Sequence, residues 1–211
     1  MKPVFEEKTA PCKAACPIGN PIAKFMTLVT LGREDEALAA IREENPLPSV
    51  CGRVCPHPCI PACNRAGFDE ALKVNEVERF LGDQAATLGS CLPVAKAPTG
   101  KRVAVIGSGP AGLGAAYHSA LLGHAVTVYE KETQPGGLLR FGIPTYRLPR
   151  ELLDRDLQFI KQLGIDLVTS APVDRELYDK LLATCDAVCV AVGAQKSYRL
   201  AVEGEDSTGV M

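Results

Sequence analysis

Apolar residues in the second half of the chain fall into short runs separated by longer stretches with helical spacing. The short runs predict strands over residues 103–106, 124–130, 165–169 and 187–192. The longer stretches predict helices over residues 110–122, 149–163 and 175–183. The first run, Val103–Ile106, is apolar throughout, as is typical of a buried parallel strand, and strand–helix–strand units of this length fit the right-handed crossover. This half therefore predicts a parallel α/β domain over residues 100–211.

The first half of the chain has helical spacing without strand signals. A helix is expected to begin after Asn20, which can serve as its N-cap with Pro21 in the first turn, and to end near Gly32. Further helices are predicted over residues 34–44 and 70–89. Residues 1–92 thus predict a small all-α domain, and residues 90–100 predict a linker. This all-α part has too few large apolar residues to be stabilised by its core alone, so a bound metal cluster would add stability.

Composition excludes two classes of function and indicates a compartment. The 211 residues carry a formal net charge of −2, which does not predict a surface that binds nucleic acid. No apolar run approaches the length of a membrane span, and the N-terminus lacks the apolar region of a signal peptide. A cytoplasmic, reducing location is therefore expected. In such a compartment, the nine cysteines are interpreted as metal or redox sites before disulfides.

A glycine-rich turn lies between the first predicted strand and helix of the α/β domain. Gly107, Gly109 and Gly112 complete the pattern G-x-G-x-x-G. The first glycine permits a tight turn, the second lets the backbone approach a pyrophosphate, and the third lets helix and strand pack closely. Glu130 ends the next strand, where an acidic side chain accepts from a ribose hydroxyl, so FAD or NAD fits better than NADP. A glycine-rich turn without a ligand is the alternative.

The glycine pattern alone does not distinguish a site for FAD from a site for NAD, but two further segments help to do so. Residues 134–138, with the sequence QPGGL, look like the segment that follows the acidic strand end in FAD-binding flavoproteins. The last predicted strand ends in AVGA at residues 191–194, which resembles another feature of those proteins. Both segments favour FAD and a Rossmann-like fold.

The first 63 residues contain a second candidate site of six cysteines: Cys12, Cys16, Cys51, Cys55, Cys59 and Cys63. The last four recur every four residues, but Pro56, Pro58 and Pro61 exclude a regular helix, so residues 46–66 predict a loop folded around a ligand. An iron–sulfur cluster needs thiolates held in this way. Zinc is the competing interpretation, although the C-x2-C knuckles usual for zinc are absent. Disulfides are the third.

The remaining residues with metal-binding side chains predict simpler roles. His57 lies between two prolines and is expected to be a solvent-facing loop residue. Cys185 and Cys189 are expected to be buried small apolar residues of the α/β domain. Cys91 lies in the linker, and no role is assigned to it.

Several longer segments together resemble one family. The runs APCKAACP, ENPLPSVCGRVCPHPCIPACNRA, VAVIGSGPAGLGAA and PGGLLRFGIPTYRLPRE are similar to the front of the small (beta) subunit of NADPH-dependent glutamate synthase. The same module resembles the N-terminal region of dihydropyrimidine dehydrogenase and the large subunit of electron-bifurcating transhydrogenases. The resemblance covers nearly the whole chain. It implies an α+β protein in which an alpha-helical ferredoxin domain precedes a truncated, Rossmann-like FAD domain.

The resemblance also implies which residues hold the cofactors. One 4Fe–4S cluster would be bound by Cys16, Cys55, Cys59 and Cys63. FAD would be contacted by Gly107, Gly109, Pro110, Ala111, Gly112, Glu130, Lys131, Gly137, Leu138, Arg147 and Val173. Arg147 would pair with the pyrophosphate, with a surface ion pair as its alternative. No side chain is expected to act as acid, base or nucleophile, because the cofactors carry the chemistry.

This sequence departs from the family in two places. Members with two clusters carry a C-x2-C just upstream of the position of Cys12, where this chain has VFEE at residues 4–7. A second cluster would keep only Cys12, Cys51 and Glu78, so one cluster is expected. Family members also continue past Met211 into an NADPH-binding domain and then finish the FAD domain. The chain is therefore expected to be a fragment or a subunit completed by a partner, with NADPH bound only through that absent domain.

Three functions from different classes follow. The main hypothesis is an electron-transfer module of an NAD(P)H-dependent oxidoreductase, which passes electrons between FAD and a 4Fe–4S cluster with a larger redox subunit or acceptor as its partner. The alternative is a non-catalytic docking subunit, or a zinc-stabilised nucleotide-binding protein without redox function. The sequence does not indicate the final electron acceptor.

Overall fold

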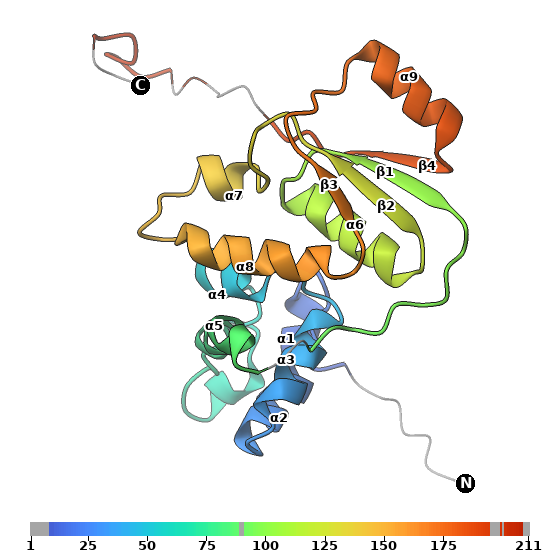
Figure 1. Ribbon diagram of the computed structural model, residues 1–211. Helices are drawn as coiled ribbons and strands as arrows, with labels where there is room; N and C mark the ends of the chain where they lie inside the picture. The colour runs from blue at the N-terminus through green and yellow to red at the C-terminus, as the bar shows by residue number, and fades with distance from the viewer. Residues whose placement is uncertain (1–8, 89–90, 195–198, 200, 209–211) are drawn as a thin grey trace, which may run out of the picture.

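The structure is a computed structural model that describes residues 9–88, 91–194, 199 and 201–208. Helices form the first part of the chain, and a sheet with helices on both faces forms the second (Figure 1). We call these the helical part and the sheet part. This arrangement confirms the predicted fold class.

The helical part contains α1 (Pro11–Ala15), α2 (Ile22–Thr30), α3 (Glu34–Arg42), α4 (Pro48–Val54), η1 (Asn64–Gly67), α5 (Val74–Asp83) and η2 (Gln84–Ala86). The sheet part contains β1 (Arg102–Ile106), α6 (Pro110–Leu121), β2 (Ala125–Tyr129), α7 (Leu138–Phe141), α8 (Arg150–Lys161), β3 (Asp166–Val168), α9 (Arg175–Thr184) and β4 (Ala187–Val190). Within the described residues, no helix is both long and apolar enough to cross a membrane.

The four strands form one parallel sheet with the order β3-β2-β1-β4. Strand β1 lies inside this sheet and is buried on both faces. Val105 faces a core shared with Leu113 of α6, whereas Ala104 and Ile106 face Leu181 of α9. Helices α6 and α9 therefore cover opposite faces (Figure 1). The strand order reverses between β1 and β4, and open α/β sheets bind their ligands beside such a switch point.

The predicted strands and long helices are all present, but four short helices were not predicted: α1, α4, η1 and α7. Helix α4 matters most, because it lies in the region predicted to be a loop. Pro48 begins it, at a position where the missing N–H of proline is not needed, and Cys55 ends it. The prolines that exclude a helix come only after Cys55. The prediction of a loop throughout residues 46–66 is therefore wrong, and Cys51 lies in a helix.

Asn20 does not cap helix α2, contrary to the prediction. The residue at the N-cap is Pro21, with no side-chain capping hydrogen bond. Asn20 is buried instead, and its Nδ2 donates to Glu78 Oε1 of α5 at 3.0 Å. A partner from a distant part of the chain thus replaces the local cap.

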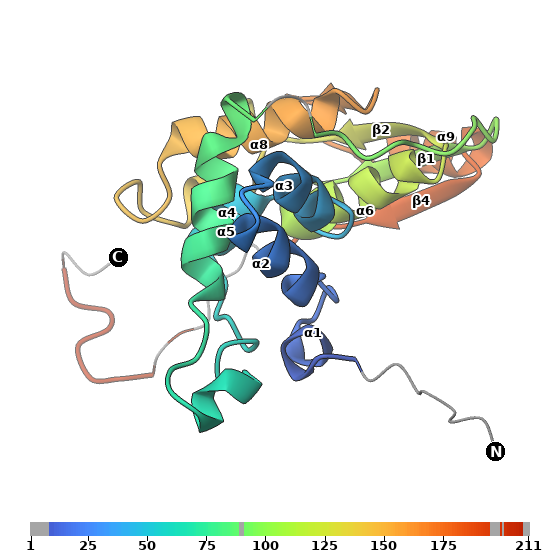
Figure 2. The ribbon, with the colours of Figure 1, turned by 90° about the horizontal axis from the view of Figure 1, so that it is seen from below.

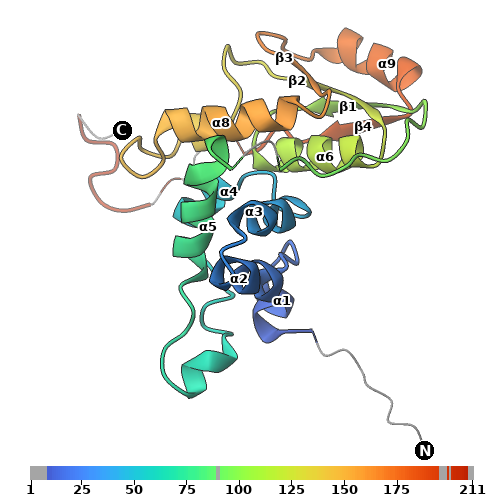
Figure 3. The same cartoon turned by 60° about the horizontal axis from the view of Figure 1, so that its bottom comes forward.

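The helical part packs on the sheet part mainly through α4 and α8. Leu47 and Val50 share one buried core with Leu157 of α8. Asp156 of α8 accepts hydrogen bonds from the backbone N–H groups of Ser49 and Val50, at 3.1 and 3.3 Å, and from Ser49 Oγ at 3.0 Å. Figure 3 shows α8 between the sheet and α4. Apolar and polar contacts therefore join the two parts at the same place.

A second contact joins α3 to the sheet part. Tyr117 Oη of α6 donates to the carbonyl oxygen of Arg42 at 2.6 Å. The Arg42 guanidinium lies over the ring of Phe159 of α8, 3.4 Å from the ring centre. Burial lowers the pKa of Arg42 and raises that of Tyr117. Arg42 Nε and Nη1 have no hydrogen-bond partner in the described part of the chain, so the aromatic ring is a main contact of this buried cation.

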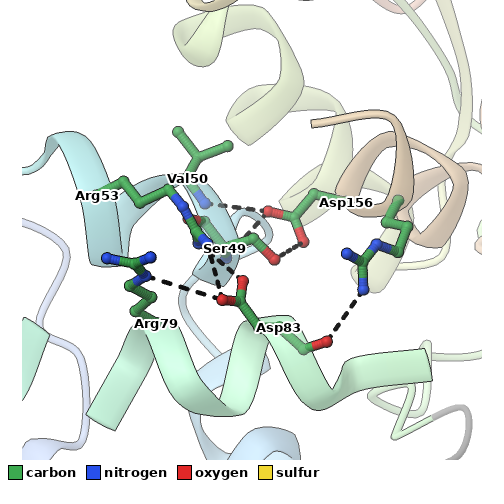
Figure 4. Close-up of polar contacts among 7 residues, drawn as sticks. Ser49, Val50, Arg53, Arg79, Asp83 and Asp156 are labelled. Atoms are coloured by element: carbon green, nitrogen blue, oxygen red, sulfur yellow. Dashed lines mark hydrogen bonds and ion pairs between the residues drawn. The ribbon is translucent and has the colours of Figure 1, made fainter. Parts of the chain in front are cut away.

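A glycine lets helices α4 and α5 approach each other closely. A Cβ atom on Gly82 would lie 2.6 Å from the backbone nitrogen of Ser49. Figure 4 shows the polar contacts beside this crossing, where Arg53 of α4 donates to both carboxylate oxygens of Asp83 at 2.8 and 2.7 Å. Helix α4 is thus held by α5 as well as by α8.

Helix α1 and the loop that follows α4 lie on the side of the helical part away from the sheet (Figures 2 and 3). Together these two segments, with their end residues, carry five of the six N-terminal cysteines: Cys12, Cys16, Cys55, Cys59 and Cys63. The cysteine set therefore lies apart from the sheet, with α4 reaching from one to the other.

Replacing Gly82 by alanine is expected to destabilise the protein by about 1–3 kcal/mol, the usual cost of overpacking, because the new Cβ would meet the backbone of Ser49. Gly114→Ala in α6 is the matched control, since nothing lies within 4 Å of its added Cβ. It is expected to stabilise by up to about 1 kcal/mol through helix propensity. Urea-induced unfolding measures both. Equal shifts in the same direction would contradict the close crossing of α4 and α5.

Candidate cofactor sites

A cavity of about 580 Å³ opens at the carboxyl ends of the parallel strands. Its wall is formed by residues 106–111, 129–132, 137–138, 141, 171–173 and 191–193. These segments follow β1, β2, β3 and β4 or belong to α7. The cavity therefore lies at the switch point where parallel α/β sheets bind nucleotides.

The glycines of the predicted fingerprint have the geometry of a dinucleotide-binding turn. Gly107 has φ +102°, and a Cβ atom there would lie 2.4 Å from the carbonyl oxygen of Ala191. A Cβ on Gly112 would lie 1.9 Å from the carbonyl oxygen of Gly107, so α6 packs directly against the turn. Gly109 has open space beside it, which is the room a pyrophosphate needs.

The Glu130 carboxylate holds this turn in place. Its Oε2 accepts from the backbone N–H of Ser108 at 2.9 Å and from the Ser108 hydroxyl, and its Oε1 accepts from the N–H of Glu132 at 2.9 Å. Burial alone would raise the pKa of Glu130, but the hydrogen bonds from Glu132 and Ser108 outweigh it and hold the pKa below its usual value. Glu130 is therefore ionised at neutral pH in the cavity wall, where it can also accept from a ligand hydroxyl.

Nine of the eleven residues expected to contact FAD line this cavity: Gly107, Gly109, Pro110, Ala111, Glu130, Lys131, Gly137, Leu138 and Val173. Gly112 lies behind Gly107, as its packing role requires. Arg147 lies exposed in the turn of residues 144–147 and is not among the lining residues. The structure does not bring Arg147 to the cavity, and its contact with FAD stays a prediction.

Cysteines from α1 and from the loop after α4 meet in the core of the helical part. Cys59 is buried, and Cys12 and Cys16 pack against the same apolar cluster. Burial, followed by the charges of the neighbouring Cys16 and Cys55, raises the pKa of Cys59 to about 11. Cys16 and Cys55 therefore both lie close enough to Cys59 to affect the charge of its thiol.

The sulfurs of Cys55 and Cys63 accept backbone hydrogen bonds. The N–H of His57 donates to Cys55 Sγ at 3.3 Å. The N–H of Leu72 donates to the Cys63 sulfur and lowers its pKa, aided by two N–H groups of η1. Hydrogen bonds of this kind stabilise thiolates and tune iron–sulfur clusters. The residues present therefore fit a cluster held by cysteine thiolates.

His57 is not a solvent-facing residue, contrary to the prediction. It is half-buried, and its Nε2 lies 3.1 Å from the carbonyl oxygen of Cys51. Its φ of +53° places it in the left-handed region, which turns the chain away from α4. His57 thus connects the end of α4 to the cysteine loop.

The residues considered for a second cluster have protein partners. Glu78 Oε1 accepts from Nδ2 of Asn20 and of Asn45, at 3.0 and 2.8 Å, and Asn45 Oδ1 lies 3.6 Å from Cys51 Sγ. Burial raises the pKa of Glu78 to about 7 and that of Cys51 to about 12. Among the residues that the structure describes, no three cysteine, histidine or acidic side chains converge on a position for a single metal ion.

Two polar residues of these sites were not predicted, because their partners are distant in sequence. Ser108 links Glu130 to the next glycine segment, since its Oγ accepts from the N–H of Gly136 at 3.1 Å. Asn45 links Glu78 to Cys51. The only sequence signals are a serine between two fingerprint glycines and an asparagine before a proline, which indicates a helix end.

Comparison with known proteins assigns both parts of the chain. Residues 5–90 match the family model described as dihydropyrimidine dehydrogenase domain II, 4Fe-4S cluster. Residues 105–166 match the family model described as an NAD(P)-binding Rossmann-like domain. The expected cofactor classes, a 4Fe–4S cluster and a flavin or nicotinamide dinucleotide, are confirmed by these matches.

Three relatives match nearly the whole chain. It is 40% identical over 206 residues to NADPH-Fe(3+) oxidoreductase subunit beta of Geobacter sulfurreducens, and the aligned residues cover 96% of this chain and 31% of that relative. It is 41% identical over 199 residues to the glutamate synthase [NADPH] small chain of Bacillus subtilis, and the aligned residues cover 93% of this chain and 40% of that relative. It is 40% identical over 222 residues to NADP(+)-dependent formate dehydrogenase subunit beta of Moorella thermoacetica, and the aligned residues cover 94% of this chain and 31% of that relative.

The two family matches define a protein in which an iron–sulfur domain precedes a Rossmann-like dinucleotide-binding domain, and the three relatives are named as oxidoreductase, synthase or dehydrogenase subunits. Within this class, the chain is a homologue of the glutamate synthase small chain over nearly its own whole length, as the resemblance predicted. It spans between 31% and 40% of the length of the three relatives described above.

Glu130→Gln is expected to lower stability at pH 7 by about 1–3 kcal/mol, because one of its oxygens becomes an amide donor that faces donors. Since the folded-state pKa of Glu130 is lowered, its contribution is complete above the unfolded-state pKa of about 4.3 and is lost as the pH falls through the folded-state value. The difference in urea midpoint between wild type and variant should therefore shrink in acid. Glu132→Gln, with its half-exposed side chain, is the control and should show no such trend. A difference that is independent of pH would contradict the role of Glu130.

Proposed function

We propose that this chain is the front of an electron-transfer module of an NAD(P)H-dependent oxidoreductase of the glutamate synthase small-chain type. The observation that carries the proposal is that a dinucleotide cavity and a set of neighbouring cysteines occur in one chain, in two parts joined by buried contacts. The names of three relatives support it, because each includes NADPH or NADP(+).

The dinucleotide proposed for the cavity is FAD. The backbone of residues 107–111 would hold the pyrophosphate, and Glu130 would accept from a ribose hydroxyl and disfavour a 2′-phosphate. Leu138, Phe141 and Val173 give the wall apolar surface that excludes water. A bound flavin would supply hydride and one-electron chemistry, and a bound cluster would supply one-electron transfer. The side chains of this chain bind and orient these groups and need not transfer a proton.

The proposed cluster ligands are Cys16, Cys55, Cys59 and Cys63. Cys16 and Cys55 lie close enough to Cys59 to affect the charge of its thiol, and Cys63 has the backbone N–H donors that a thiolate requires. A second set of Cys12, Cys51 and Glu78 has less support, because Asn45 already contacts both Cys51 and Glu78.

The proposal extends to the organisation of the protein. We assign residues 1–92 to the cluster domain and residues 100–211 to the FAD domain, and we place the binding of NAD(P)H in a region outside this chain. The relatives are named as subunits or small chains, which favours a larger redox subunit as the partner. The many unpaired cysteines favour a cytoplasmic location.

A stepwise reductive titration tests the function. Anaerobically purified protein supplied with FAD should show reversible bleaching of the flavin bands together with the electron paramagnetic resonance signal of a reduced 4Fe–4S cluster. Protein that binds FAD without reversible reduction, or that gives no cluster signal, would overturn the proposal.

Two substitutions should separate the two sites. Gly109→Ala adds a Cβ in open space, so the fold should persist while FAD affinity falls by at least about tenfold, or 1.4 kcal/mol. Cys55→Ser should lose the cluster and keep FAD. Cys185→Ser, at the end of α9, is the control and should keep both cofactors. Fluorescence titration with FAD and iron analysis measure these outcomes. Loss of the cluster in Cys185→Ser, or its full retention in Cys55→Ser, would contradict the ligand set.

A further inference from the structure

We propose that Asp156 is a positioning residue for the cluster: by holding the first turn of α4 it fixes Cys51 and Cys55 relative to the nucleotide-binding sheet. The inference rests on the proposed function, because it takes Cys55 to be a cluster ligand. Nothing in the sequence marks Asp156, which follows another acidic residue and an arginine in the middle of an amphipathic helix.

Asp156 belongs to the sheet part, but its hydrogen-bond partners belong to the helical part. It is only 2% exposed. The backbone N–H groups of Ser49 and Val50 both donate to its Oδ2, and Ser49 Oγ donates to its Oδ1 (Figure 4). Ser49 and Val50 lie in the first turn of α4, where backbone N–H groups have no partner within the helix. The carboxylate thus supplies from α8 the acceptors that α4 lacks.

Helix α4 connects this contact directly to the cysteines. Cys51 follows Val50 in the same helix, and the N–H of Cys55 donates to the carbonyl oxygen of Cys51 at 3.2 Å. His57 contacts the same carbonyl oxygen through Nε2, and its own N–H donates to Cys55 Sγ. A shift of the first turn would therefore be passed through one helix to both cysteines.

Arg155, the residue before Asp156, contacts helix α5, which packs against α4. Arg155 Nη1 donates to the carbonyl oxygen of Asp83 at the end of α5, at 3.0 Å. The side chain of Asp83 is in turn bonded by Arg53 of α4. Neighbouring residues of α8 thus place a carboxylate on the N–H groups of the first turn of α4 and a guanidinium on the last carbonyl of α5.

The other end of α8 holds the wall of the nucleotide cavity. Arg150 donates to the carbonyl oxygens of Leu139 at 2.9 Å and of Ile143 at 2.7 Å, and Asp154 forms an ion pair with Arg140. These partners belong to α7 or follow it directly, and α7 lines the cavity. One helix therefore contacts both candidate sites, which makes it the physical link between them.

The chemistry of the contact indicates which substitution should be tolerated. Burial raises the pKa of Asp156 to about 7, against the hydrogen bonds from Ser49 and Val50. An asparagine at this position keeps one oxygen for the two N–H groups and can donate its amide to Ser49 Oγ, which also accepts. Alanine leaves both N–H groups unsatisfied, and glutamate displaces the carboxylate by one methylene group.

Asp156→Ala, Asp156→Glu and Asp156→Asn are therefore compared with the wild-type protein that contains its cluster. The readouts are the midpoint potential and paramagnetic resonance spectrum of the cluster, the rate of iron release to a chelator, and hydrogen exchange at the amides of Ser49 and Val50. The alanine and glutamate variants should release iron about tenfold faster, the lower end of the effect of outer-shell partners, and should lose amide protection. Asp156→Asn should stay close to wild type.

Asp154→Ala is the matched control, because Asp154 lies on the same helix and contacts Arg140 instead of α4. Its cluster readouts should not change. If the alanine variant does not fold, the glutamate and asparagine variants decide the question. Wild-type cluster properties in the alanine and glutamate variants would overturn the inference. A wild-type protein without any cluster would instead overturn the proposed function, while the exchange of the Ser49 and Val50 amides would still test the contact.

Discussion

The buried hydrogen bonds between Asp156 and the first turn of α4 are the interaction on which the rest of this structure depends. A carboxyl group and two helix N–H groups are removed from water together, and each would cost about 1–3 kcal/mol if it were left without a partner. Their pairing satisfies α4 with a group from a different part of the chain. The surrounding core, which contains Leu47, Val50 and Leu157, adds apolar burial at the same place.

The two helices that meet at this contact, α8 and α4, each support one of the two candidate sites. Toward the sheet, α8 supports α7, which lines the cavity at the strand ends. Toward the helical part, α4 leads to Cys55 and the cysteine loop, with α5 packed closely behind it at Gly82. The cavity and the cysteine set are therefore built on neighbouring rigid elements, which is what fixed electron-transfer geometry needs. Loops alone would not provide it.

Sequence reasoning succeeded where the physical cause is local. The apolar runs gave the strands, and the glycine pattern gave the turn, because a tight turn, a pyrophosphate approach and helix packing each demand glycine at fixed spacing. It failed where the cause is a distant partner. Asn20 has a side chain typical of an N-cap but donates its hydrogen bond to Glu78 instead. His57 contacts the carbonyl oxygen of Cys51 and is not solvent-facing. The prolines after Cys55 suggested a loop, although helix α4 lies before them. Arg147 lies outside the cavity wall because of the turn at residues 144–147, and the spacing of apolar residues does not predict this turn.

We propose that this chain holds an iron–sulfur cluster and a flavin together. The most direct measurement is the content of iron, zinc and flavin in one anaerobically purified sample, taken with its visible absorption spectrum. We expect flavin bands, no stoichiometric zinc and about four irons per chain, the content of one 4Fe–4S cluster. Colourless protein with one zinc and no flavin would contradict it.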